Sequence, residues 1–166
     1  MLKIVKHLIG DETIQKLIDG CDEFTVNETP NETNHNYYFR KYIENQDGIL
    51  NDYINQINDY NNQNFIVKYT VVNSWINRVT IETNKTDPPH YDDANLTFVT
   101  YLNDDYAGGE FEYFLDGKSF IIKPEKGLTL VMNDELFHRV LPIDDGIRYS
   151  LITFCRFGSK NKSTLI

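Results

Sequence analysis

The stretch from residue 65 to residue 157 constrains the fold most, because it consists of short β-branched and aromatic runs separated by turn residues. Turns such as Asp116-Gly117 and Asp145-Gly146 separate consecutive runs. Many short strands at this spacing are typical of an all-β sandwich or barrel, and a jelly roll suits them. The pattern predicts eight strands, at residues 65–72, 75–81, 97–102, 109–115, 120–122, 128–132, 139–143 and 148–157.

The first 64 residues carry helical patterns instead. Residues 11–19 begin with acidic side chains, place apolar residues at positions 14, 17 and 18, and end at Gly20, which predicts a short helix. In residues 37–60 apolar and aromatic side chains recur near helical spacing, which predicts one long helix or two helices broken at Gly48. Residues 27–36 lack periodicity and predict a loop.

Both patterns fit within a single domain. No repeat or linker separates them, and 166 residues suit one core. We therefore expect one domain over residues 1–166, mainly β with amino-terminal helices. Residues 1–64 are expected to form a helical support region on the outside of one sheet, and residues 65–157 the jelly-roll catalytic core.

The composition limits the partners and the compartment. A formal net charge of -9 repels phosphate backbones, which makes nucleic acid a disfavoured partner. Cys21 and Cys155 lie far apart, and Cys155 lies inside an apolar run, which favours reduced thiols. No run reaches the roughly 18 apolar residues of a membrane span, so we expect no membrane contact and a cytoplasmic location. The sequence leaves the oligomeric state open.

His90 and Asp92 follow the pair Pro88-Pro89 and are two residues apart. On an extended segment both side chains project from the same face, so one imidazole and one carboxylate converge on one point. Such a pair supplies two of the ligands of a metal site. For the pair alone, a solvated turn is the alternative.

A third ligand has to come from the other histidines. His7 lies in the amino-terminal stretch and His35 in the polar loop, whereas His138 opens a predicted strand. Strands from opposite ends of a β-domain can bring His90, Asp92 and His138 together, which gives the two-His, one-carboxylate triad of non-haem Fe(II) sites. Three ligands on one octahedral face leave positions open for substrates.

Arg148 lies ten residues after His138 and is followed two residues later by Ser150. On a strand, Arg148 and Ser150 therefore face the same side. A buried arginine needs a carboxylate or phosphate partner, and its planar fork suits a bidentate carboxylate. Ser150 can add a hydroxyl donor to the same anion. A surface ion pair with Asp144 or Asp145 is the alternative for Arg148.

Four motifs in this order resemble those of the 2-oxoglutarate- and Fe(II)-dependent dioxygenases, nearest to their prolyl 4-hydroxylase-like branch. The motifs are His90-x-Asp92, Tyr106-Ala-Gly-Gly-Glu-Phe111, His138 and Arg148-x-Ser150. The resemblance covers roughly residues 72–157. It implies a double-stranded β-helix, a cupin-like jelly roll, which agrees with the strand pattern.

The resemblance also implies a set of ligands. Fe(II) would bind His90, Asp92 and His138. 2-Oxoglutarate would chelate the iron, with its far carboxylate on Arg148 and Ser150. O2 is the other co-substrate, and ascorbate is a further candidate cofactor. Family members that halogenate lack the carboxylate ligand, so Asp92 favours hydroxylation.

The chain departs from the prolyl hydroxylase pattern before the first ligand. The family commonly places a co-substrate-binding tyrosine nine or ten residues ahead of it, where this chain has Ile81 and Thr80. Thr80, or Tyr101 from a neighbouring strand, is therefore the candidate for that contact. Many prolyl 4-hydroxylases also carry lysine in place of Arg148. Candidate aromatic walls of the site are Tyr91, Tyr101, Phe137 and Phe154.

Together the motifs predict a dioxygenase that hydroxylates an unactivated C–H bond and releases succinate and CO2. The leading substrate is a prolyl, or other amino-acid, side chain of a protein or peptide. A small-molecule or nucleobase oxygenase on the same scaffold and a non-catalytic metal-binding β-barrel are the alternatives. Arg148 disfavours the last, because a plain binding module needs no anion-binding arginine there. Loops at residues 23–36 and 84–89 are expected to select the substrate.

Overall fold

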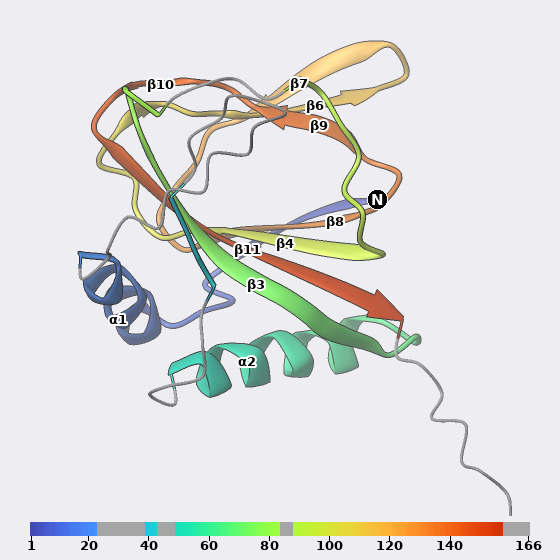
Figure 1. Cartoon of the computed structure of the whole chain (residues 1–166). Coiled ribbons are helices and arrows are strands. Elements are labelled where there is room, and N and C mark those ends of the chain that lie inside the picture. Colours follow the sequence, from blue (N-terminus) through green and yellow to red (C-terminus); the bar gives the residue numbers. More distant parts are fainter. Residues whose placement is uncertain (23–38, 43–48, 84–87, 158–166) are drawn as a thin grey trace, which may run out of the picture.

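Strands dominate the computed structural model, which describes residues 1–22, 39–42, 49–83 and 88–157 (Figure 1). Neither helix in these ranges is long and apolar enough to cross a membrane. The helices are α1 (Asp11–Asp22) and α2 (Ile49–Asn64). The strands are β1 (Leu2–Lys6), β2 (Phe39–Tyr42), β3 (Tyr69–Thr80), β4 (Leu96–Tyr101), β5 (Ala107–Gly108), β6 (Phe111–Leu115), β7 (Lys118–Ile122), β8 (Leu128–Asn133), β9 (Phe137–Val140), β10 (Ile143–Asp145) and β11 (Ile147–Phe157).

The strands form two facing layers (Figure 1). One layer is a six-stranded sheet in the order β1-β8-β4-β11-β3-β2. The other holds the three-stranded sheet β7-β6-β9 and the pair β10-β5. The pairings are antiparallel, and neighbours in the large sheet are far apart along the chain, so the chain crosses repeatedly between the layers. This architecture is the predicted jelly roll, a double-stranded β-helix.

Both helices pack on the outer face of the large sheet (Figure 1). Ile14 and Ile57 of the helices join Ile76, Phe98 and Leu151 of the sheet in one buried cluster. Burying each of these side chains contributes about 1.5–3 kcal/mol. The strand residues between them point the other way, into a second cluster that includes Trp75, Val99, Tyr101 and Ile152. The central strands are therefore covered on both faces, and the space between the two layers is the interior of the barrel.

The amino-terminal third is less helical than residues 37–60 predict. Phe39–Tyr42 is β2, which pairs with β3, so the helix prediction is wrong there. Apolar spacing over so few residues suits a strand as well as a helix, and pairing with the edge of β3 decides between them. The predicted break at Gly48 and the predicted loop at residues 27–36 lie outside the described residues, and α2 begins at Ile49.

Several strand boundaries also differ from the predictions. The strands predicted at residues 65–72 and 75–81 are one strand, β3, which begins only at Tyr69. It continues through the polar Ser74, whose hydroxyl bonds Thr153 Oγ1 at 2.7 Å. The strand predicted at residues 139–143 divides into β9 and β10 around Pro142, which has no N–H to donate. β1 and β5, which pair with β8 and β10, were not predicted. The predicted helix at residues 11–19 is confirmed as α1, although α1 continues past the predicted stop at Gly20 to Asp22.

Candidate active site

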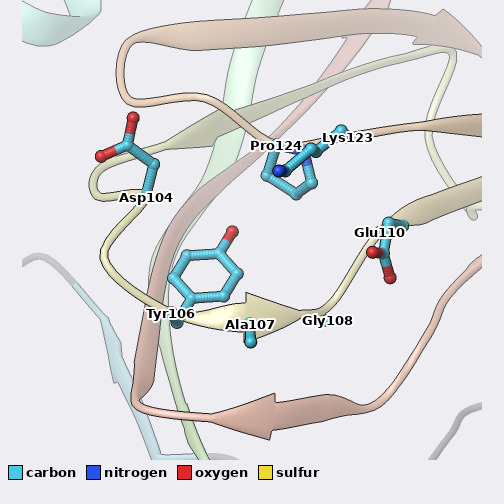
Figure 2. Close-up of a pocket in the computed structure, with 7 residues that line it drawn as sticks. All are labelled: Asp104, Tyr106, Ala107, Gly108, Glu110, Lys123 and Pro124. Atoms are coloured by element: carbon cyan, nitrogen blue, oxygen red, sulfur yellow. The ribbon is translucent and has the colours of Figure 1, made fainter.

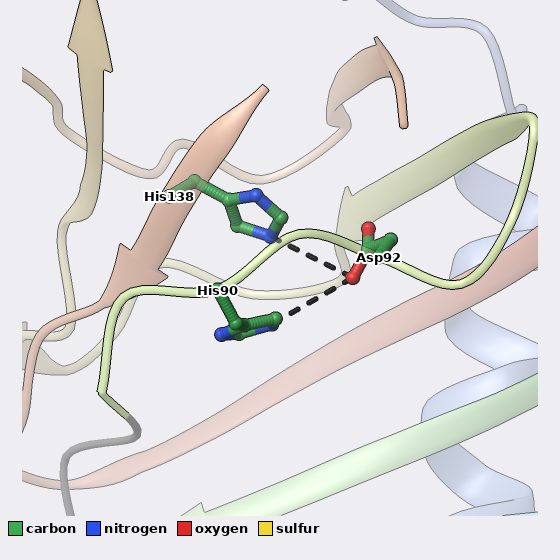
Figure 3. Close-up of side chains that lie close together, drawn as sticks. All are labelled: His90, Asp92 and His138. Atoms are coloured by element: carbon green, nitrogen blue, oxygen red, sulfur yellow. Dashed lines mark ion pairs between the residues drawn. The ribbon is translucent and has the colours of Figure 1, made fainter. Parts of the chain in front are cut away.

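His90, Asp92 and His138 lie close together, with His138 on β9 and the other two on the segment before β4 (Figure 3). The segment that carries His90 runs beside β9, where His90 and His138 exchange two backbone hydrogen bonds of 2.8 and 3.0 Å. Asp92 Oδ1 lies 3.6 Å from His90 Nε2 and 3.8 Å from His138 Nε2. One ligand atom of each residue lies within 4.8 Å of the others. The structure thus brings together the three residues predicted to bind the metal.

The other ring nitrogen of each histidine is held by a backbone carbonyl. His90 Nδ1 lies 3.0 Å from the oxygen of Pro88, and His138 Nδ1 lies 2.9 Å from the oxygen of Leu136. A carbonyl only accepts, so each Nδ1 carries the proton and each Nε2 keeps its lone pair. Both lone pairs then face Asp92, which is the arrangement that a metal-binding histidine needs.

Two of the three side chains have pKa shifts that favour their metal-binding protonation states. Burial lowers the pKa of His138, whose side chain is 6% exposed. For Asp92 burial acts to raise the pKa, but its interactions with the two histidines outweigh burial, and the pKa is lowered. A neutral imidazole and an ionised carboxylate are the forms that coordinate a cation. Two histidines and one carboxylate suit Fe(II), so the residues present fit that ion.

A second group of polar side chains shares the inner face of the large sheet. Ser150 on β11 lies directly opposite Tyr101 on β4 and Asn77 on β3. Residues opposite each other in a sheet point to the same side, and Arg148, two positions before Ser150, points there as well. These four side chains therefore face the interior between the two layers, where Tyr101 joins the inner cluster.

Arg148 and Tyr101 have buried hydrogen-bond donors without an acceptor among the described residues. Arg148 is 6% exposed, and within the described part of the chain its Nε and Nη1 have no hydrogen-bond partner. The Tyr101 hydroxyl is likewise buried and unpaired among those residues. Burial raises the pKa of Tyr101 to about 12 despite the nearby charge of Arg148, so the phenol stays protonated and can donate. Unpaired buried donors are costly, and a carboxylate is the acceptor that fits an arginine fork. The residues present therefore fit a bound carboxylate such as that of 2-oxoglutarate.

The structure places Thr80 away from this group. Thr80 lies one position from Val79, which is opposite Arg148, so its side chain points to the other face of β3. Its hydroxyl donates to Glu82 Oε2 at 2.7 Å. We leave Thr80 out of the proposed site. Asn77, whose buried Oδ1 has no partner among the described residues, faces the interior instead and was not predicted.

One aromatic ring contacts the triad directly, and the predicted aromatic walls lie elsewhere. Phe111 stacks on His138 with ring centroids 5.1 Å apart, a neighbour that the sequence did not reveal. Tyr91 is 59% exposed and packs against Phe137 at 4.9 Å. Phe154 packs on Trp75 inside the barrel. Of the side chains predicted to line the site, Tyr101 and Phe154 face the interior of the barrel, whereas Tyr91 lies at the surface.

Residues 74–156 match the 2OG-Fe(II) oxygenase superfamily. The chain belongs to this superfamily. It is therefore a dioxygenase enzyme that uses Fe(II) and 2-oxoglutarate, as the order of the motifs predicted. Of the functions that the sequence left open, this excludes the non-catalytic binding module. No curated protein sequence matches this oxygenase.

Solved structures share the fold of this oxygenase over nearly its whole length. A viral collagen prolyl hydroxylase from Paramecium bursaria Chlorella virus 1, in complex with 2-oxoglutarate, aligns with TM-score 0.72 and 16% identity over 95% of this chain and 96% of its own. A Pseudomonas putida prolyl-4-hydroxylase aligns with TM-score 0.73 and 20% identity over 95% and 92%. A Trichoplax adhaerens prolyl hydroxylase, in complex with a hypoxia-inducible-factor peptide fragment, aligns with TM-score 0.68 and 13% identity over 94% and 83%. At these identities the likeness concerns the fold.

Proposed function

We propose that this oxygenase hydroxylates an unactivated C–H bond of a prolyl, or other amino-acid, side chain in a protein or peptide, with release of succinate and CO2. The observation that carries the proposal is the metal-binding triad, which is open to solvent at His90. The prolyl hydroxylases that share the fold favour a peptide as the substrate.

His90, Asp92 and His138 would hold Fe(II), which together with 2-oxoglutarate and O2 supplies the oxidising power for hydroxylation when bound. The carbonyls of Pro88 and Leu136 fix the orientation of the two imidazole rings. The triad is open on one side, because the side chain of His90 is 43% exposed while that of Asp92 is 10% exposed. A substrate would therefore approach past His90.

Arg148 would bind the far carboxylate of 2-oxoglutarate through its unpaired Nε and Nη1. The Tyr101 hydroxyl is the second donor, and Ser150 lies between it and Asn77 in the same row of the sheet. We call Arg148, Tyr101, Ser150 and Asn77 the carboxylate cradle. Because the cradle is buried, water is excluded from the ion pair between Arg148 and the bound carboxylate. This exclusion strengthens their electrostatic attraction.

The candidate docking surface for the substrate consists of Tyr91, Phe137 and Phe114. It lies around the edge of β9 from the triad, because Phe137 and His138 are neighbours on the strand and point to opposite faces. Tyr91 lies between the first two ligands in the sequence, and its ring packs on Phe137 at 4.9 Å. Phe137 in turn packs on Phe114 at 5.5 Å. Tyr91 is exposed and the two phenylalanines are partly exposed. Aromatic rings at a surface are a usual docking site for proline-containing peptides, whose extended conformation costs little entropy to fix. The prolyl hydroxylases with the same fold, one of them in complex with a peptide, support this choice.

The net charge disfavours the nucleobase alternative. A chain with formal charge -9 repels a polyphosphate backbone, and this repulsion would oppose docking of a nucleic acid at the triad. A peptide has no such penalty, and a basic peptide would be attracted.

The test uses purified protein with Fe(II), O2, 2-oxoglutarate and a panel of proline-containing peptides. We expect a proline-containing peptide to gain one oxygen atom by mass spectrometry and to stimulate succinate formation, whereas the same peptide with alanine in place of proline does neither. Tyr91→Ala should weaken the peptide stimulation while leaving 2-oxoglutarate binding unchanged. Hydroxylation of a free small molecule, with no peptide modified, would refute the peptide assignment.

A further inference from the structure

Tyr106 is a second buried phenol near Arg148 that the function above does not use. Its hydroxyl oxygen is buried and has no hydrogen-bond partner among the described residues. Tyr106 also lines a cavity of about 210 Å³, shown in Figure 2. The other residues of the cavity wall are Asp104, Ala107, Gly108, Glu110, Lys123 and Pro124. Tyr106 therefore borders both this cavity and the part of the barrel that holds Arg148.

Gly109 brings the Tyr106 ring and the Arg148 guanidinium to the same place. A methyl group built on Gly109 would lie 3.1 Å from Arg148 Nη1 and 3.1 Å from Tyr106 Cε2. Cε2 is bonded to the ring carbon that carries the hydroxyl, so the phenol edge and the unpaired Nη1 both border the space that Gly109 leaves free. The side chains of Tyr101 and Arg148 also act electrostatically on the Tyr106 hydroxyl.

We propose that the Tyr106 hydroxyl is a further donor of the carboxylate cradle, where it binds the far carboxylate of 2-oxoglutarate together with Arg148 and Tyr101. The inference rests on the proposed function, because it presumes that Arg148 binds that carboxylate. It explains why three buried donors in one part of the barrel lack acceptors in the protein.

The protonation state of the Tyr106 hydroxyl and the energetic cost of leaving it unpaired both agree with a donor role. Burial, followed by the nearby Tyr101 hydroxyl, raises the pKa of Tyr106 well above the ordinary value of a phenol, so the hydroxyl keeps its proton at neutral pH. A buried hydroxyl without an acceptor is destabilising, and a bound carboxylate would remove that cost. Tyr106 would thus favour a 2-oxo acid with a second carboxylate over one that ends in a methyl group.

The test measures anaerobic binding of two probes to the Fe(II)-loaded protein by calorimetry. The probes are 2-oxoglutarate and 2-oxopentanoate, which has the same chelating head but a methyl group in place of the far carboxylate. Tyr106→Phe should weaken 2-oxoglutarate binding roughly tenfold or more, because a hydrogen bond to a charged group is lost, and leave 2-oxopentanoate unchanged. Equal effects on the two probes, or none on either, would overturn the inference.

Tyr149→Phe is the matched control. Tyr149 adjoins Arg148 on the opposite face of β11, and its hydroxyl accepts from Arg78 Nε at 3.2 Å. This variant should bind both probes as the wild type does. If the wild type itself fails to bind 2-oxoglutarate, the proposed function fails. If the wild type binds 2-oxoglutarate and Tyr106→Phe binds it equally well, this inference fails and the proposed function stands.

Discussion

Gly109→Ala tests whether the space beside Arg148 is needed for co-substrate binding. Gly109 has a φ of +71° and lies between β5 and β6, where its N–H donates to the oxygen of Pro142 at 2.7 Å. An alanine methyl group there would lie 2.9 Å from Ile143 Cγ2 and 3.1 Å from Arg148 Nη1. The substitution therefore adds backbone strain and forces the guanidinium to move.

The size of the effect follows from these two contributions. A left-handed conformation costs a residue with a Cβ about 1–2 kcal/mol. Overpacking at Ile143 and Arg148 should cost a further 1–3 kcal/mol, roughly the usual cost of an oversized side chain in a packed site. Gly117→Ala is the matched control, because Gly117 has a φ of +74° but no atom within 4 Å of the added methyl group. It should lose only the conformational part, about 1–2 kcal/mol.

Urea unfolding and 2-oxoglutarate titration of both variants provide the assay. Gly109→Ala should lose clearly more stability than Gly117→Ala and bind 2-oxoglutarate at least about tenfold more weakly, because Arg148 Nη1 is displaced. Gly117→Ala should bind it as the wild type does. Equal stability losses together with unchanged binding in both variants would refute the idea that Gly109 makes room for Arg148.

Three further predictions concern single side chains. Arg148→Ala should keep the metal and weaken 2-oxoglutarate by roughly 10–100-fold, measured by calorimetry; unchanged affinity would exclude Arg148 from the cradle. Tyr53→Phe should lower the free energy of unfolding by about 1–2 kcal/mol, because Tyr53 is fully buried and bonded to the Thr153 hydroxyl, and it should leave 2-oxoglutarate binding intact. Burial raises the pKa of Cys155 from 9.0 to about 12, which lowers its thiolate fraction near neutral pH about a thousandfold. In Cys21→Ser protein a thiol reagent should therefore react with Cys155 only on unfolding, and rapid reaction of the native protein would contradict the described burial.

The metal-binding residues could be predicted from the sequence because they depend on order and on local geometry. His90 and Asp92 share a face of an extended segment, and His138 was the histidine at the start of a strand. The structure confirms that the three meet. The jelly roll was equally accessible, because turn residues and β-branched runs act locally. Ascorbate use and a cytoplasmic location stay predictions.

The residues that the sequence missed depend on register and on the path of the backbone. Thr80 and Asn77 are both polar and three positions apart, and only the pairing of β3 with β11 shows that Asn77 shares the face of Arg148. Tyr106 lies far from Arg148 along the chain, and Gly109 brings them together. β2 was missed because its apolar residues fit helical spacing, while the free edge of β3 selects a strand.

The most direct test of the proposed site is calorimetric titration of 2-oxoglutarate into anaerobic protein with and without Fe(II). Asp92→Ala and Asp93→Ala form a matched pair, because Asp93 adjoins the triad in sequence but has a 94% exposed side chain paired with Arg156. The wild type and Asp93→Ala should show tight, Fe(II)-dependent binding, and Asp92→Ala should lose it. A wild type that binds no 2-oxoglutarate with Fe(II) present, or an Asp92→Ala variant that binds it equally well, would contradict the proposed site.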